Sequence, residues 1–90
     1  MNPTKNIENF QSGQPCPLSR FPSGLHGTVV DVTADAELQG RLMGMGLVVG
    51  TRFQLIRSGG TTRRIPFLLA VGETRIAFGR EIAEMILVEP

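Results

Sequence analysis

The sequence contains a single cysteine, Cys16, a single histidine, His26, and neither tyrosine nor tryptophan among its 90 residues. One cysteine forms no disulfide within the chain, so the fold must depend on its apolar core, and such cysteine usage is typical of a reducing cytoplasm. A structural zinc site needs about four ligands, most of them Cys or His, which these two residues do not supply. The composition therefore predicts no resident metal and no cofactor.

Catalytic side chains are equally scarce. The sequence places no nucleophile beside His26, and nothing near Cys16 is expected to lower the pKa of its thiol. The glycines between positions 40 and 50 are followed by no lysine, so they form neither a phosphate-binding loop nor a dinucleotide fingerprint. We therefore predict no catalytic residues and no enzyme activity.

Charge of one sign is not in excess, because nine Lys or Arg stand against eight Asp or Glu. With one basic cluster, Arg63 and Arg64, and no Tyr or Trp for base stacking, the sequence predicts no nucleic-acid partner. No apolar run reaches the roughly 20 residues that span a membrane, and residues 1–14 lack the apolar segment of a signal peptide. We expect a cytoplasmic protein that does not insert into a membrane.

The chain is long enough for one small core. Residues 1–16 are polar and rich in Asn, Gln, Ser and Pro, which predicts a flexible N-terminal tail before a folded domain at residues 17–90. Leu18 and Leu25 are expected to be buried where this domain begins.

Five segments have the β-branched or alternating pattern of short strands: 28–32, 52–56, 67–71, 74–78 and 86–88. Gly72 opens a two-residue connection that favours a type II′ hairpin between the third and fourth segments. Short strands with tight connections predict a mainly β fold, a small SH3-like barrel of about five strands. One main helix is expected after the first strand, and a short helical turn near the C-terminus carries Ile82 inward.

The main helix can begin at Thr33 or Asp35, whose short side chains cap free backbone amides, and it is expected to run to about Met45. Leu38, Leu42 and Met45 fall on one face at helical spacing. This face is predicted to pack on the core.

The end of this helix is rich in glycine. Gly40 lowers helix stability by about 1 kcal/mol relative to alanine, and Gly44 repeats the cost, so a close contact or a function should compensate. Gly46 suits the left-handed conformation after the helix, which would fold Leu47 back onto the core in a Schellman turn. Gly50 suits a second turn.

Apolar residues that the periodicity places on outer surfaces favour a protein-binding role over catalysis. The candidate partner-binding residues lie at the helix end and on strand 67–71: Met43, Gly44, Gly46, Leu47, Val49, Leu68 and Ala70. The short edge strands of a small barrel also leave assembly into a homo-oligomer open.

A second reading of the polar residues is a weak divalent-metal site, in an oligomer, formed by His26 with Asp31, Asp35 or Glu37. The more common role of such carboxylates is a solvated strand end and helix start.

The string Arg41-Leu42 followed by residues 44–51 resembles the signature of the FeoA family, ferrous iron transport protein A. The similarity extends over residues 17–90 through Leu18-Ser19, Gly27, Leu42, Gly46-Leu47, Gly50, Gly72 and Ala77-Phe78. Val49 stands where the family usually has proline.

This resemblance implies an SH3-like, cytoplasmic accessory that docks on the membrane transporter FeoB, a permease that carries a GTPase, without a strong iron site of its own. SH3-like domains with similar sequences also occur at the carboxyl ends of iron-dependent repressors. The alternative is therefore a metal-responsive regulatory domain that acts on a transcriptional regulator.

Overall fold

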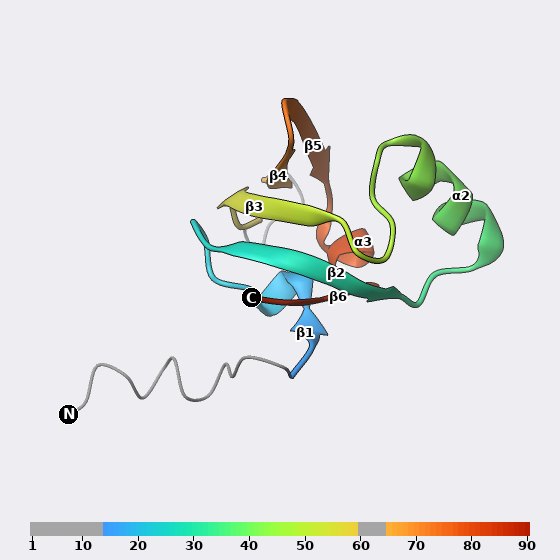
Figure 1. Cartoon of the computed structure of the whole chain (residues 1–90), viewed down its shortest axis with the longest axis horizontal. Coiled ribbons are helices and arrows are strands. Elements are labelled where there is room, and N and C mark those ends of the chain that lie inside the picture. Colours follow the sequence, from blue (N-terminus) through green and yellow to red (C-terminus); the bar gives the residue numbers. More distant parts are fainter. Residues whose placement is uncertain (1–13, 60–64) are drawn as a thin grey trace.

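The computed structural model describes residues 14–59 and 65–90, which form one curved antiparallel sheet with short helices around it (Figure 1). Along the chain the elements are β1 (Cys16–Pro17), η1 (Leu18–Arg20), β2 (His26–Val32), α2 (Ala36–Gly44), β3 (Arg52–Arg57), β4 (Phe67–Val71), β5 (Thr74–Phe78), α3 (Arg80–Ala83) and β6 (Ile86–Glu89). The strand order in the sheet is β1-β6-β2-β3-β4-β5. The prediction of a mainly β, SH3-like fold is confirmed, with six strands in an open sheet instead of about five in a barrel.

The additional strand is β1, which pairs Cys16 with Val88 and Pro17 with Leu87. Two residues that include a proline give no alternating pattern, so this strand leaves no signal in the sequence. Cys16, assigned to the tail from its composition, thus belongs to the sheet. The rest of that tail through residue 13, and the Arg63-Arg64 cluster, lie outside the described residues.

β2 is a central strand, with β6 on one side and β3 on the other. Its register with β6 shifts between Val29 and Asp31, which marks a β-bulge. A bulge bends its strand and increases the local twist. Before the bulge the strand alternates, with Val29 fully buried and Val30 next to it only half-buried.

A close approach of two aromatic rings and a backbone carbonyl explains the glycine at position 27 of β2. A Cβ atom there would lie 2.7 Å from Cζ of Phe21, 2.9 Å from Cζ of Phe53 and 2.9 Å from the carbonyl oxygen of Glu89. The two rings pack against each other with their centroids 5.4 Å apart and tilted by 56°. Gly27 thus lets an aromatic pair lie directly on the strand.

The core is entirely apolar among the described residues. Its buried members are Leu18, Phe21, Val29, Leu42, Leu47, Phe53, Leu55, Phe67, Leu69, Ile76, Phe78, Ala83, Ile86 and Val88. Alternation in the strands predicts burial of Phe67, Leu69, Val71, Ile76 and Phe78, and all of these except Val71 are buried. Val71 and Ile82, which was expected to point inward, are only partly buried.

The predictions that Leu25 is buried and that Met45 packs on the core are wrong. Leu25, expected in the core, is 39% exposed, and its backbone carbonyl instead accepts a hydrogen bond from the Leu55 amide at 3.0 Å. Met45 is 41% exposed because it is the C-cap residue of α2, where the chain leaves the helix. Figure 1 shows that α2 lies at one end of the sheet, so the helix flanks the sheet and does not plug it.

α2 begins at Asp35, whose Oδ1 accepts a hydrogen bond from the Leu38 amide at 2.9 Å. The other candidate cap, Thr33, instead donates its hydroxyl to the carbonyl oxygen of Met85 at 3.1 Å. A Cβ atom at Gly40 or Gly44 would meet nothing within 4 Å. The close contact expected to compensate for these two helical glycines is therefore not present in the fold.

The β4–β5 connection has positive φ, +60°, at Gly72, and no described residue other than glycine has positive φ. A positive φ at the first of the two turn residues alone is the type II′ combination, because type I′ requires it at both. The hairpin closes with Val71 opposite Thr74.

The same substitution at two glycines should change stability in opposite directions. Gly27→Ala should lower the free energy of unfolding by about 1–3 kcal/mol, because its methyl group overpacks the aromatic pair. Gly40→Ala should raise it by about 1 kcal/mol, because the methyl group enters open space on a helix. Urea denaturation of both variants measures the difference, and an unchanged midpoint for Gly27→Ala would contradict the close packing.

Cys16 reports on the docking of β1. Burial raises the pKa of its thiol, and the positive charge of Arg20 opposes this only in part. Because the thiolate is the reactive form, alkylation by iodoacetamide at pH 8 should be roughly several-fold slower in the folded protein than in urea. Mass spectrometry of timed samples gives both rates. Equal rates would mean that β1 does not shield the thiol.

Candidate functional site

A surface hollow of about 250 Å³ lies between the end of β2, one side of α2 and the chain that follows α2. We call it the helix-end hollow, and its lining residues are Asp31, Val32, Gln39, Met43, Leu47, Val48 and Val49. Five of these seven side chains are apolar, and Asp31 is the only charged one. The hollow is therefore an apolar surface with one acidic group at its margin.

Exposed apolar side chains are concentrated around this hollow. Met43 and Val49 are each 62% exposed, and Met45 and Val48 are 41% and 39% exposed. These four are more than half of the seven large apolar residues exposed in the described chain. Single exposed apolar residues are common on protein surfaces, but a group of four within seven positions is a candidate contact surface.

The chain leaves α2 through a Schellman turn that brings Leu47 to the hollow. Gly46 has a φ of +96°, the Leu47 amide donates to the carbonyl oxygen of Leu42 at 2.8 Å, and the Gly46 amide donates to that of Met43 at 2.9 Å. Leu42 and Leu47 are both buried in the core. The turn thus fixes the helix end to the core while Met43 stays exposed.

A second turn carries Val48 and Val49, which also line the hollow. The Thr51 amide donates to the carbonyl oxygen of Val48 at 3.0 Å, and Gly50 has a φ of +95°, which is the geometry of a type II turn. Two further hydrogen bonds tie this turn to β2: Gly50 donates to Val29 at 2.7 Å, and Val29 donates to Thr51 at 2.9 Å. Val49 occupies a central position of the turn, so its exposed side chain projects from a fixed backbone.

Gln39 joins α2 to the end of β2, because its Nε2 donates to the carbonyl oxygens of Ala34 at 2.7 Å and Val32 at 3.2 Å. Asp31 Oδ1 accepts a hydrogen bond from the Val32 amide at 2.8 Å. Gln39 and Asp31 were not predicted to lie at this surface. Gln39 lies four residues before Met43, and this spacing, which places both on one face of the helix, could have predicted Gln39 at this surface.

The structure separates the predicted partner-binding residues into two places. Met43, Leu47 and Val49 line the helix-end hollow, and Gly44 and Gly46 belong to the adjoining helix end and turn. The other two, Leu68 and Ala70, lie on β4 and are half-buried, paired with Ala77 and Arg75 of β5.

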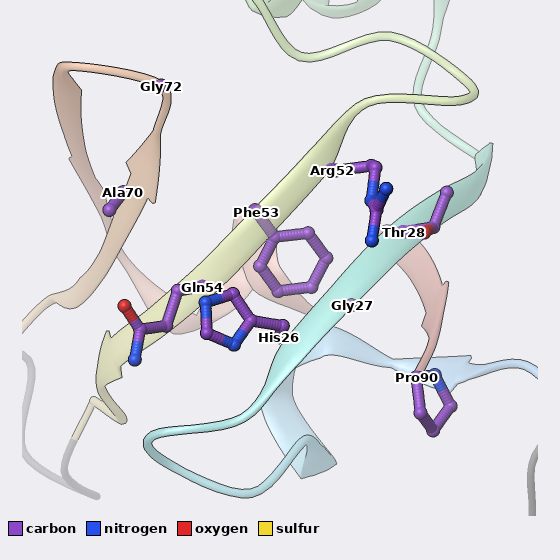
Figure 2. Close-up of a pocket in the computed structure, with 9 residues that line it drawn as sticks. All are labelled: His26, Gly27, Thr28, Arg52, Phe53, Gln54, Ala70, Gly72 and Pro90. Atoms are coloured by element: carbon purple, nitrogen blue, oxygen red, sulfur yellow. The ribbon is translucent and has the colours of Figure 1, made fainter.

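Ala70 contributes to a different hollow, of about 330 Å³, on the outer face of the sheet (Figure 2). It is lined by His26, Gly27, Thr28, Arg52, Phe53, Gln54, Ala70, Gly72 and Pro90. The register places His26 opposite Gln54 and Thr28 opposite Arg52. Figure 2 shows the corresponding side chains side by side on the neighbouring strands β2 and β3.

Within one chain, the described residues do not bring together the side chains considered for a divalent-metal site. In the described part of the chain, no group of three His, Cys, Asp or Glu side chains is placed to hold a metal ion. His26 begins β2 and Asp31 lies near its other end, while Asp35 and Glu37 follow at the start of α2. The residues are close in sequence, but an extended strand separates the imidazole from the carboxylates.

No polar or charged side chain is buried in residues 14–59 and 65–90. Among the helices in the described part of the chain, none is long and apolar enough to cross a membrane.

Comparison with solved structures finds similar chains. The crystal structure of an iron uptake regulatory protein, FeoA, is 28% identical with a TM-score of 0.71, over 84% of this chain and 96% of that chain. The solution structure of the FeoA protein from Chlorobium tepidum is 27% identical with a TM-score of 0.70, over 81% and 68% of the two chains. No curated protein sequence matches significantly.

A manganese-dependent transcriptional repressor shares the fold at 18% identity and a TM-score of 0.75, over 88% of this chain but 43% of the repressor. At this identity the likeness concerns the fold alone. The model of the FeoA domain family, in contrast, matches residues 16–90, from the first residue of β1 to the end of the sequence. This match covers most of the chain and every strand of its sheet, and the protein therefore belongs to the FeoA domain family.

Proposed function

We propose that this chain is a non-enzymatic, cytoplasmic accessory that supports ferrous iron uptake by docking on a FeoB-type membrane transporter. Its membership of the FeoA domain family, and its similarity to an iron uptake regulatory protein, support the link to iron uptake. The observation that supports docking is the helix-end hollow, where exposed apolar side chains gather on a hydrogen-bonded backbone.

The energetics of this surface favour protein binding. Burying apolar surface contributes about 25 cal/mol per Å² of favourable free energy. Met43 and Val49 are each 62% exposed, so a partner that covers them gains binding free energy from their burial. The Schellman turn and the type II turn already fix the backbone around them, which reduces the ordering cost of association. The residues that contribute most to binding cluster at the desolvated centre of an interface, which is where a docked partner would place Met43 and Val49.

Leu68 and Ala70 form a second, smaller region of the proposed contact. Both are half-buried and lie on β4, whose neighbour β5 is an edge strand with a single partner strand in the described sheet. An unpaired edge also offers a route to self-association, so a homo-oligomer remains part of the proposal.

Substitutions in the helix-end hollow should weaken binding to the transporter. Met43→Glu and Val49→Glu each place a charge in the proposed apolar contact, and each should raise the Kd for the purified transporter in nanodiscs at least about ten-fold, or about 1.4 kcal/mol. Leu25→Glu is the matched control. Leu25 is also an exposed apolar residue, but it lies just before the first residue of β2, at the opposite end of that strand from the helix-end hollow. Leu68→Glu tests the β4 region separately.

Circular dichroism and urea denaturation establish that each variant is folded. Full binding by folded Met43→Glu and Val49→Glu would remove the helix-end hollow as the docking face. Purification of the tagged chain from its native cells decides between the two partner classes. Enrichment of a transcriptional regulator in place of a permease would favour the regulatory alternative.

A further inference from the structure

The helix-end hollow carries an acidic group that the fold itself does not neutralise. Asp31 is the only charged residue that lines the hollow, and it is exposed. Its Oδ1 accepts a hydrogen bond from the adjacent Val32 amide, and no ion pair joins it to any residue in 14–59 or 65–90. A carboxylate beside exposed apolar side chains therefore remains available to a cation from outside the chain.

The last turn of α2, which contributes Met43 to the hollow, adds potential of the same sign. α2 lines the hollow with Gln39 and Met43 on one of its sides, and it ends at Gly44, with Met45 as its C-cap residue. The C-terminal end of a helix carries a partial negative charge from its aligned peptide dipoles. Asp31 and the end of α2 together make the margin of this hollow electronegative.

The basic residue of α2 does not offset this potential. Arg41 lies midway between Gln39 and Met43, the two helical residues that line the hollow. At 100° per residue, side chains two positions apart point to opposite sides of a helix, whereas those four apart share one face. Arg41 consequently belongs to the other side of α2.

The size of the hollow favours protein side chains over a whole small molecule. Pockets for small ligands typically measure about 300–1,000 Å³ and enclose most of the ligand. The helix-end hollow, at about 250 Å³, is smaller and lies on the surface between α2 and β2. A hollow of this size suits an apolar side chain inserted from a partner.

We propose that the helix-end hollow recognises a partner segment in which an apolar side chain is followed by Lys or Arg. The apolar side chain would lie among Met43, Val48 and Val49, and the cation would pair with Asp31. This inference rests on the proposed docking function and names the chemistry of the docked segment. The outer-face hollow has the opposite character, because Arg52 is its charged side chain.

Three blocked hexapeptides test this preference directly. They are identical except that a central Leu is followed by Arg, Gln or Glu, and each is titrated into the full ¹⁵N-labelled chain. The amides of Asp31, Val48 and Val49 should shift, and the Arg peptide should bind about two- to five-fold more tightly than the Gln peptide, with the Glu peptide weakest. The difference should shrink in high salt.

Two charge-removing variants separate the local carboxylate from net charge. Asp31→Asn keeps an oxygen that accepts from Val32, so the fold should persist while the Arg and Gln peptides become equal. Glu73→Gln changes the net charge equally, lies in the β4–β5 turn outside the hollow, and should preserve the preference. Equal binding of all three peptides to the unsubstituted chain, shifts centred on Arg52, or no shifts at all would overturn the inference.

The outcome for the docking proposal itself is distinguishable. If Met43→Glu weakens transporter binding but the peptides show no charge preference, the docking face stands and the basic partner residue is wrong. If the peptides bind in the stated order but the transporter does not bind, the chemistry of the hollow stands and its assignment to the transporter fails.

Discussion

The insertion of Leu42 and Leu47 into the apolar core is the constraint on which the rest of this surface depends. α2 lies at one end of the sheet, and these two buried residues attach its C-terminal end to the core. Gly46 makes the insertion of both possible, because its positive φ reverses the chain immediately after the helix. The same reversal leaves Met43 and Val49 on the outside, at the rims of a hollow.

A fold this small has little interior in which to place chemistry. The sheet, η1 and α3 enclose an apolar core, and the described part of the chain buries no polar or charged side chain. Gly27 illustrates how tightly this core is used, since two phenylalanine rings lie against its backbone. The two hollows described above are at the surface, where the apolar hollow with an acidic margin and the hollow beside Arg52 lie toward opposite ends of β2.

Local patterns predicted the elements well, because they depend on interactions between near neighbours in the chain. The Asp35 cap, the Gly46 turn and the Gly72 hairpin involve residues only a few positions apart. Burial of Leu25 and Met45 was predicted wrongly for the opposite reason. The sequence pattern shows which residues are apolar, but only the packing of whole elements decides which of these residues are covered by the core.

The sequence by itself determined an SH3-like β fold, a helix ending in a glycine turn, and exposed apolar residues at Met43 and Val49, because propensity, alternation and turn chemistry are local. Only the tertiary structure decided that β1 joins the sheet, that Asp31 and Gln39 border the same hollow as Met43, and that Leu68 lies elsewhere. These placements follow from strand register and from the β-bulge in β2, which arise when distant segments pair.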